Sequence, residues 1–370
     1  SLLLQIQELL NGTVRDLFLD HALRPAAELS LNERAFLIRH FFSANWATMV
    51  RPHRRYHELL VKRGTEVHGQ DLPSLARQFT TQDFLDLQVW HNLAWFGFGA
   101  VAQYPRLREF RAKDRGFSEE EKQEVLAIQR QVVAEVLPAY RRLADRGQIE
   151  LTTSPFYHPI LPLVIDSDVS RRARPDLPLP PRFQATEDAA QHIQKAMQLH
   201  QEVFGHAPTG MWPSEGSVSP ELIPLVQRAG VQWMATDEGV LARSLGASWH
   251  RQTMLYQPYR VGEPGQEISM VFRDRELSDA IGFVYHKTTT DSAVDDFFRR
   301  IHAIAHETPG SQMLLPIILD GENAWEHYFD GGEGLLRGIY RGLSQETTGE
   351  RGTPFIRTER MAASIASAST

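Results

Sequence analysis

The sequence predicts an α/β protein with a parallel sheet and a largely helical first third, and two observations lead to this fold class. After Gly147, short apolar segments typical of strands alternate with amphipathic segments typical of helices, which indicates βαβ units. Two acidic residues, Glu215 and Asp320, each end an apolar segment and precede a glycine, as side chains do where parallel strands end at a cleft. We therefore expect three regions: a mainly helical one at 1–147, a parallel β/α core with both acids at 148–345, and a disordered or truncated tail at 346–370.

The first third has the start signals and the periodicity of helices. Ser30 and Glu33 have the spacing of a capping box and predict a helix that begins there. Residues 81–96 carry so many apolar side chains that we expect this helix to be deeply buried. A second capping box at 118–121 begins a helix that runs to Gly147, and Pro138 is expected to kink it.

The core region is expected to contain six strands. A loop with four prolines, at 173–183, separates the first of them from the others. The expected strands are 149–153, 210–214, 232–236, 253–261, 268–273 and 313–319, and the expected helices are 186–204, 219–229, 275–281 and 292–307.

Composition excludes several classes of protein. The 370 residues are 42% hydrophobic and 23% charged, which is ordinary for a water-soluble globular chain. A net charge of −7 argues against a general affinity for nucleic acid. The chain has no cysteine and no run of 18 apolar residues, so we expect a cytoplasmic protein without disulfides and without a membrane partner. The sequence does not indicate an oligomeric state.

The two acids have the chemistry of a glycosidase. Two carboxylates are the minimum equipment for cleaving a glycosidic bond, and indole faces such as those of Trp212 and Trp325 suit the apolar side of a sugar. Asp320 ends the most apolar predicted strand, so we expect partial burial that would raise its pKa and suit a general acid. Two plainer interpretations stay open: Glu215 as an acid at a helix N-terminus, and Asp320 with Gly321 as an ordinary turn.

Long motifs around these acids resemble those of a known family. WPSEGSVS and LDGENAWEHY are similar to the nucleophile and general-acid motifs of glycoside hydrolase family 57, retaining enzymes that act mostly on α-glucans. The stretches IELTTSPFYHPILPL, WMATDEGVL and FRDRELSDAIGFVY support the resemblance, which covers about 78–340. The last stretch favours the amylase or amylopullulanase-like branch; 4-α-glucanotransferases and branching enzymes also occur in the family.

The resemblance implies a role for each acid. Glu215 would be the nucleophile that forms a covalent glycosyl-enzyme, and Asp320 the general acid/base, in preference to the nearby Glu322 and Glu326. Hydrolysis and transglycosylation both remain open, with an α-glucan as substrate and no cofactor.

Other polar residues follow predicted strands and are expected to line the same mouth. His158 is expected to bind sugar by the resemblance, and Trp212 and Trp325 either stack on sugar or belong to the core. Arg273 with Asp274 either orients a sugar hydroxyl or the nucleophile, or forms a structural salt bridge. The expected substrate-binding set is Glu150, His158, Trp212, Asp237, Glu238, Arg273, Asp274 and Trp325.

The resemblance also implies a seven-stranded (β/α) barrel whose first strand carries a His-Gln-Pro motif, and this tripeptide is absent here. With six predicted strands and a start at Ser1 within a helical pattern, we expect an N-terminally truncated (β/α)7-type barrel that lacks its first strand and has a helical insertion in its N-terminal third. The alternative is a catalytically impaired carbohydrate-binding or regulatory barrel. His302 and His306 have zinc-ligand spacing but neutral surroundings, so we expect no metal and no zinc-dependent α-mannosidase.

Overall fold

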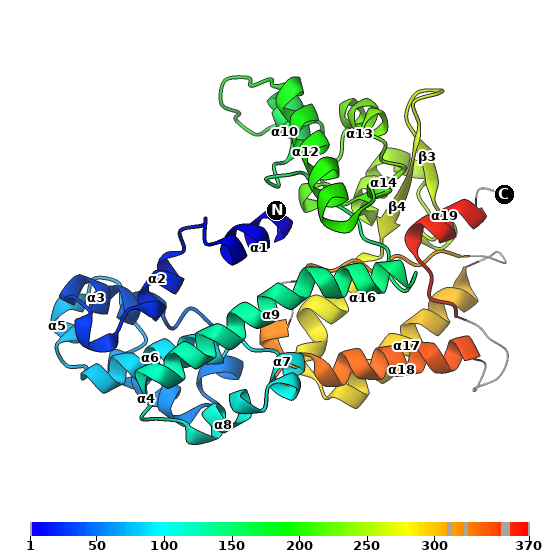
Figure 1. Cartoon of the computed structure of the whole chain (residues 1–370). Coiled ribbons are helices and arrows are strands. Elements are labelled where there is room, and N and C mark those ends of the chain that lie inside the picture. The colour runs from blue at the N-terminus through cyan, green and yellow to red at the C-terminus, as the bar shows by residue number, and fades with distance from the viewer. Residues whose placement is uncertain (1, 309–312, 322–324, 349–355, 369–370) are drawn as a thin grey trace. The chain divides into compact units, whose positions relative to one another are not determined.

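The computed structural model of the chain describes residues 2–308, 313–321, 325–348 and 356–368. They form two compact units (Figure 1). We call Ser1–Gln5 with Leu137–Leu319 and Gly338–Thr370 the sheet unit, and Ile6–Val136 with Asp320–Arg337 the helical unit. This division differs from the regions expected from the sequence. The boundary falls inside a helix, next to Pro138, and residues 320–337 group with the helical unit.

The helical unit consists of short helices joined by turns. Two helices, α1 (Leu2–Asn11) and α9 (Glu119–Asp145), belong to both units. The others are α2 (Leu17–Leu23), α3 (Leu31–His40), α4 (Arg54–Arg63), α5 (Leu72–Ala76), α6 (Thr81–Leu93), α7 (Phe98–Gln103) and α8 (Pro105–Lys113), with 3-10 turns η1 (Ala26–Glu28) and η9 (Trp325–His327) and a π-helical turn η2 (Trp46–Val50).

Side-chain caps fix where two of these helices begin. Ser30 Oγ accepts the Glu33 amide, and the Glu33 carboxylate accepts the Ser30 amide at 2.8 Å, which confirms the predicted capping box. Thr80 and Asp83 cap α6 in the same way. Eleven of the thirteen residues of α6 are buried, so the deep burial predicted for this helix is confirmed and α6 is the centre of the unit's core.

Helix α6 also buries two carboxylates, which are paired with basic side chains. Arg55 donates to Asp83 at 2.5 Å and to Asp86 at 2.7 Å, and Lys62 donates to Asp83 at 2.7 Å. Burial acts to raise the pKa of Asp83, but the hydrogen bonds from Lys62, the Thr80 amide and Arg55 outweigh it and lower this pKa to about 2.

The pairing of Asp83 predicts a specific dependence of stability on pH. Since the ordinary pKa is 3.8 and the folded one about 2, the ionised carboxylate contributes stability that is fully present above pH 3.8 and lost as the pH falls towards 2. We expect the difference in free energy of unfolding between the unaltered chain and Asp83→Asn to be constant above about pH 5 and to shrink at lower pH. This difference is measured by urea denaturation, followed by tryptophan fluorescence, at each pH.

The matched control is Asp176→Asn, which changes an exposed aspartate in the proline-rich loop. It should leave the free energy of unfolding nearly unchanged throughout. A difference for Asp83→Asn that does not vary with pH would contradict the account of this ion-pair cluster.

The sheet unit is built on a four-stranded sheet. Its strands are β1 (Gly210–Met211), β2 (Trp233–Asp237), β3 (Tyr259–Val261) and β4 (Ile268–Arg273), in the order β1-β2-β4-β3. β1 pairs with β2 and β2 with β4 in parallel, whereas β3 pairs with β4 antiparallel. Thr153 adds an isolated parallel bridge to Met211. The parallel arrangement predicted for 210–214, 232–236 and 268–273 is therefore present.

Three of the six expected strands differ from the prediction. Residues 149–153 contribute only the Thr153 bridge. Residues 253–261 end as β3 after a helical turn and fold back on β4 through residues 262–267, where Gly262 (φ 129°) and Gly265 (φ 81°) adopt backbone conformations that favour glycine. The described part of 313–319 contains no assigned strand: it lies beside β4, where the Asp274 amide donates to the Pro316 carbonyl at 2.9 Å.

The remaining helices of the sheet unit surround these strands. α12 (Thr186–Phe204) has the bounds that the sequence predicts. The others are α10 (Leu161–Ile165), α11 (Ser170–Ala173), α13 (Ile223–Arg228), α14 (Glu238–Leu245), α15 (Arg251–Met254), α16 (Arg275–Asp279), α17 (Thr290–Glu307), α18 (Glu333–Thr348, shared with the helical unit) and α19 (Met361–Ala368), with 3-10 turns η3 (Ser167–Val169), η4 (Ser214–Gly216), η5 (Pro220–Leu222), η6 (Gly246–Ser248) and η8 (Tyr285–Lys287) and a π-helical turn η7 (Ala280–Val284).

Each face of the sheet has its own apolar cluster. On one face, Met211, Met234, Met270 and Phe272 of the strands pack on α10, α12 and α13. These helices stand together beside the strands in Figure 1. Trp233, Ala235 and Val271 point to the other face and pack on Ile365 of α19. The tail at 346–370, expected to be disordered, thus contains a helix, because the buried Ile365 anchors it.

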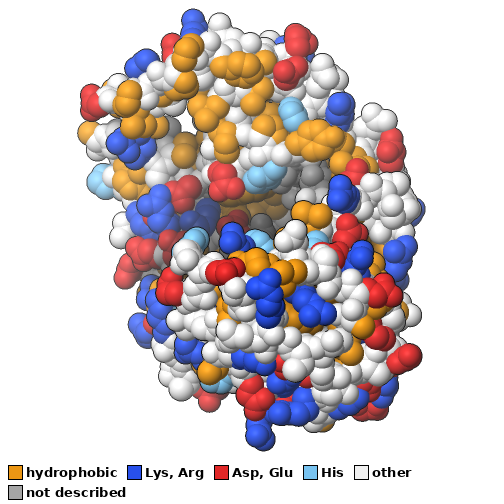
Figure 2. Space-filling view, turned by 90° about the vertical axis from the view of Figure 1, so that its left-hand side faces the viewer, with side chains coloured by type: hydrophobic (Ala, Val, Ile, Leu, Met, Phe, Trp, Pro, Cys, Tyr) orange, Lys and Arg blue, Asp and Glu red, His pale blue; other side chains and the backbone are white. Residues whose placement is uncertain are grey.

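The surface carries both signs of charge. On the face shown in Figure 2, Lys and Arg side chains are interspersed with Asp and Glu side chains. Within the described ranges, no helix has the length and apolar character needed to cross a membrane.

Candidate active site

The parallel strands end together at one edge of the sheet, which we call the carboxyl edge. β1, β2, β4 and the bridging Thr153 share this direction, so the residues that follow them gather there. Asp237 and Arg273 are register partners at the ends of β2 and β4. Seven of the residues singled out in the sequence lie at or just beyond these strand ends: His158, Trp212, Glu215, Asp237, Glu238, Arg273 and Asp274.

Glu215 has an unusual backbone conformation. It lies in η4 with φ 57° and ψ 21°, the left-handed region that residues other than glycine rarely adopt. Ser214 and Gly216 on either side are buried, whereas Glu215 is exposed. Within the described part of the chain its carboxylate forms no ion pair. Left-handed backbone costs about 1–3 kcal/mol and is characteristic of functional turns, so this residue is the strongest candidate at the edge.

The turn around Glu215 is held by buried contacts. The Gly216 amide donates to the Pro213 carbonyl at 2.9 Å, and the fully buried Thr236 hydroxyl donates to the Gly216 carbonyl at 2.5 Å. Gly216 itself has φ 65°, and a Cβ atom there would lie 3.1 Å from Cη2 of Trp212. The half-buried Trp212 therefore packs directly over the turn, and the positive φ together with this close contact favours glycine at position 216.

Beside this turn, Asp237 and Arg273 belong to a network of ion pairs. Arg273 donates to Asp237 at 3.3 Å, to the Ile318 carbonyl at 2.9 Å and to Asp279. Arg275 also donates to Asp237. Burial acts to raise the pKa of Asp237, but the hydrogen bonds from Arg275, the Gly239 amide and Arg273 lower it overall.

A second part of the network surrounds Asp274, which is fully buried. Its carboxylate accepts from Arg251 at 2.9 Å, from the Tyr256 hydroxyl at 2.9 Å and from the Leu277 amide at 2.9 Å, so it also caps α16. Arg251 reaches Glu238 at 3.3 Å as well. Burial, followed by the nearby Asp274 charge, raises the pKa of Tyr256.

Sequence reasoning missed four members of this network. Arg275 and Asp279 lie within the motif FRDRELSD, so their closeness to Arg273 in the chain was an available signal. Arg251 and Tyr256 lie in a segment with no motif, and only the fold brings them to Asp274.

His158 shares the strained geometry of Glu215. Its φ is 59°, it precedes Pro159, and its side chain is exposed. The residue before a proline normally adopts extended backbone, so this conformation is doubly unusual. The His158 amide donates to the Pro155 carbonyl at 2.8 Å, which stabilises the turn.

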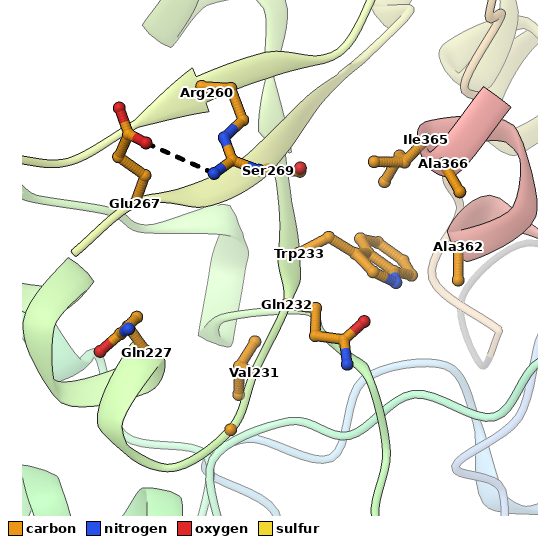
Figure 3. Close-up of a pocket in the computed structure, with 11 residues that line it drawn as sticks. Gln227, Val231, Gln232, Trp233, Arg260, Glu267, Ser269, Ala362, Ile365 and Ala366 are labelled. Carbon is orange, nitrogen blue, oxygen red and sulfur yellow. Dashed lines mark hydrogen bonds and ion pairs between the residues drawn. The ribbon is translucent and has the colours of Figure 1, made fainter. Parts of the chain in front are cut away.

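Glu150 lies at the opposite, amino edge of the sheet. It accepts hydrogen bonds from the Thr209 hydroxyl at 2.9 Å, the Trp233 indole at 3.0 Å and the Ala362 amide at 2.8 Å. A hollow of about 450 Å³ opens beside it between Trp233, α19 and the exposed Arg260–Glu267 ion pair (Figure 3). The hydrogen bonds of Glu150 tie α19 to the amino edge of the sheet. Glu150 therefore does not lie with the other candidate residues at the carboxyl edge.

Asp320 and Trp325 belong to the helical unit. Asp320 is exposed, which differs from the partial burial expected for it. Trp325 is half-buried and packs over Gly332, where a Cβ atom would lie 2.5 Å from its Cε3 atom. The segment is tied down by Asn45, which bonds His327 at 3.0 Å, and by Thr48, which donates to the Glu326 carbonyl. Glu322 lies outside the described residues.

The histidines with zinc-ligand spacing, His302 and His306, lie on α17. His302 lies 3.4 Å from the carboxylate of Glu346. No group of three or more His, Cys, Asp or Glu side chains that could hold a metal ion occurs among the residues that the structure describes.

One family model matches most of the chain, and several known proteins are similar to parts of it. The family model described as glycosyl hydrolase family 57 matches residues 18–356. Alpha-amylase 1 of Dictyoglomus thermophilum is 30% identical over 96 residues, 26% of this chain and 11% of that protein. The 4-alpha-glucanotransferase from Thermococcus litoralis is similar with 19% identity and a TM-score of 0.45, over 65% of this chain and 32% of that one. A branching enzyme from Pyrococcus horikoshii has 13% identity and a TM-score of 0.49, over 78% and 57%. This chain spans less than two thirds of the length of each of them.

The bond from Thr236 to the Glu215 turn predicts the effect of one substitution. Thr236→Val keeps the shape of the side chain but removes the hydroxyl, which leaves the Gly216 carbonyl without its donor in a buried place. We expect the free energy of unfolding to fall by about 1–3 kcal/mol. Thr236→Ser keeps the hydroxyl and should lose clearly less. Denaturation midpoints measure both, and equal stability of Thr236→Val and the unaltered chain would rule out this bond as a support of the turn.

Proposed function

The chain belongs to glycosyl hydrolase family 57, and we propose that it is a glycoside hydrolase or transglycosylase that acts on α-glucans, with Glu215 as nucleophile and Asp320 as general acid/base. Membership of this family implies a (β/α)7 barrel; the described chain is mostly helical with a small, mainly parallel sheet. The observation that carries the proposal is the exposed, left-handed Glu215 at the carboxyl edge.

The surroundings of Glu215 support its role as nucleophile. A nucleophilic carboxylate must be ionised and able to reach the anomeric carbon, and a strong ion pair would oppose both. The acids Asp237, Glu238 and Asp274 at the same edge are bound by arginines, whereas Glu215 forms no ion pair among the described residues. This division favours one acid for attack and the others for holding the edge in shape.

The position of Asp320 in the chain supports its role as general acid/base. It directly follows the segment 313–319, which is fixed beside β4 because Arg273 donates to the Ile318 carbonyl at 2.9 Å and the Ser278 hydroxyl accepts the Ile318 amide at 3.1 Å. The family motif LDGENAWEHY contains it, and the motif favours it over Glu326.

The proposed reaction has two steps. Glu215 attacks C1 of the sugar while Asp320 gives a proton to the leaving glycosidic oxygen, which forms a covalent glycosyl-enzyme. Asp320, now ionised, then removes a proton from water or from a sugar hydroxyl, and this acceptor displaces Glu215. The anomeric configuration is retained because each of the two steps inverts it.

The other predicted site residues divide by their contacts. The exposed His158 and the half-buried Trp212 and Trp325 are proposed to contact sugar rings and hydroxyls. The partly exposed Asp237, Glu238 and Arg273 are proposed to line the same mouth. The contacts of Asp274 and Glu150 favour positioning roles, since Asp274 is fully buried and Glu150 is bonded at the amino edge.

The nucleophile is tested by removing its charge. Glu215→Gln should lower turnover of maltooligosaccharides by several orders of magnitude with an unchanged circular dichroism spectrum, because the amide cannot form the glycosyl-enzyme. Azide should partly restore Glu215→Ala by attacking in place of the carboxylate. Glu263→Gln, an exposed acid at the β3–β4 hairpin, is the matched control and should retain activity. Normal turnover by Glu215→Gln would reject the assignment; absence of turnover by the unaltered chain would favour a carbohydrate-binding protein.

The acid is tested by comparing leaving groups. Asp320→Asn cannot protonate a poor leaving group, so its loss of kcat/KM should be at least about a hundredfold larger on maltotriose than on an activated aryl α-glucoside. Glu326→Gln is the control and should affect both substrates alike. Equal losses on the two substrates for Asp320→Asn, together with unequal losses for Glu326→Gln, would transfer the role to Glu326.

A further inference from the structure

Two large aromatic side chains, Tyr157 and Phe283, are exposed in segments that follow Thr153 and β4, the outer members of the parallel part of the sheet. Across this edge the order of neighbouring segments is Thr153, β1, β2 and β4. Tyr157 follows Thr153 by four residues, as Glu215 follows Met211 by four, and it is 66% exposed. Phe283 lies beyond β4 and is 57% exposed. Exposing such rings gives up the stabilisation that burial provides, so an exposed ring that is held in place near the carboxyl edge is suited to contact with a ligand.

Tyr157 is held in place although its surface is open. Its ring makes edge contacts with Phe156 at 4.7 Å and with His192 of α12 at 5.8 Å between centroids. The Phe156 amide donates to the His192 carbonyl at 3.2 Å, and the strained His158 closes the turn on the other side. The ring is thus oriented before any ligand arrives, which lowers the entropy cost of binding.

Phe283 is displayed by the π-helical turn η7, and such turns are frequent at functional sites. The turn is anchored at both ends. Asp279, just before it, pairs with Arg273 of the network, and Tyr285, just after it, is buried and donates to Asp296 at 2.9 Å. Ala280 and Ile281 are buried in the turn, whereas Phe283 points into solvent.

We propose that Tyr157 and Phe283 are stacking platforms for sugar rings on the two sides of Glu215, so that the site takes an α-glucan chain of several units rather than a disaccharide. This inference rests on the proposed function. Three strand spacings of about 4.8 Å separate Thr153 from β4, about 14 Å in all, which is wider than one sugar ring. Aromatic faces suit the apolar faces of sugars and tolerate any hydroxyl pattern at the edges.

Exposure alone does not make a platform, because single exposed aromatic residues are common on protein surfaces. The same unit supplies two matched controls. Tyr340 on α18 is 66% exposed, as Tyr157 is, and Phe183 in the proline-rich loop is 54% exposed, close to Phe283. Neither follows a parallel strand, so neither should affect glucan binding.

The test is binding by the full chain with Glu215→Gln, which separates binding from turnover. Isothermal titration with maltoheptaose should give a Kd that is about three- to tenfold higher when Tyr157→Ala or Phe283→Ala is added, as expected for the loss of one ring contact. Maltose, which cannot reach both sides, should respond to at most one of the two. Tyr157→Phe should bind normally, and so should Tyr340→Ala and Phe183→Ala. Circular dichroism confirms that each variant is folded.

The outcomes separate this inference from the proposed function. If Glu215→Gln abolishes turnover but both platform variants bind maltoheptaose as tightly as the controls, the platforms are rejected and the nucleophile stands. If the four alanine variants all weaken binding equally, the effect is not specific to the carboxyl edge and the platforms are rejected as well. No binding of maltoheptaose to the Glu215→Gln chain would overturn both.

Discussion

The candidate site depends on one local constraint, the left-handed turn at Glu215. Parallel pairing of β1 with β2 aligns the strand that leads into the Glu215 turn with the strand that carries Thr236, and this alignment lets the Thr236 hydroxyl bind the Gly216 carbonyl. Trp212 packs over Gly216 because no side chain intervenes. The strain of the turn is therefore offset by a buried hydrogen bond and an indole contact, and the turn is held by the sheet as well as by its own bonds.

The acids at the carboxyl edge differ in their ion pairs, and we infer that they differ in function for this reason. Asp237 and Asp274 are neutralised by arginines, and their hydrogen bonds fix β4, α14 and α16 relative to one another. Burying a charged carboxylate costs desolvation free energy, which is offset here because each carboxylate has several hydrogen-bond partners. Among the described residues Glu215 forms no ion pair, and this contrast with the paired acids beside it supports its assignment as the nucleophile.

The parts that the sequence predicted are those governed by local rules. The capping pair Ser30–Glu33 locates the start of α3, apolar periodicity locates α6 and α12, and a strand followed by a glycine locates the turn of Glu215. Features that depend on distant contacts were missed. Glu150 was expected at the site because it lies in the predicted strand 149–153, yet it bonds Ala362, 212 residues away. The antiparallel direction of β3 depends on the connection that begins at Gly262. The hydrogen bond from Thr236 to Gly216 depends on the register of β1 and β2, which the sequence does not show.

The covalent intermediate tests the central claim most directly. An activated α-glucosyl substrate with fluorine on the ring forms a glycosyl-enzyme quickly and releases it slowly, so the adduct can be isolated and mapped by mass spectrometry of peptides. The account predicts one added sugar on the peptide that contains Glu215, and no adduct when this residue is replaced by glutamine. An adduct on a different carboxylate, or steady turnover with no adduct at all, would contradict it.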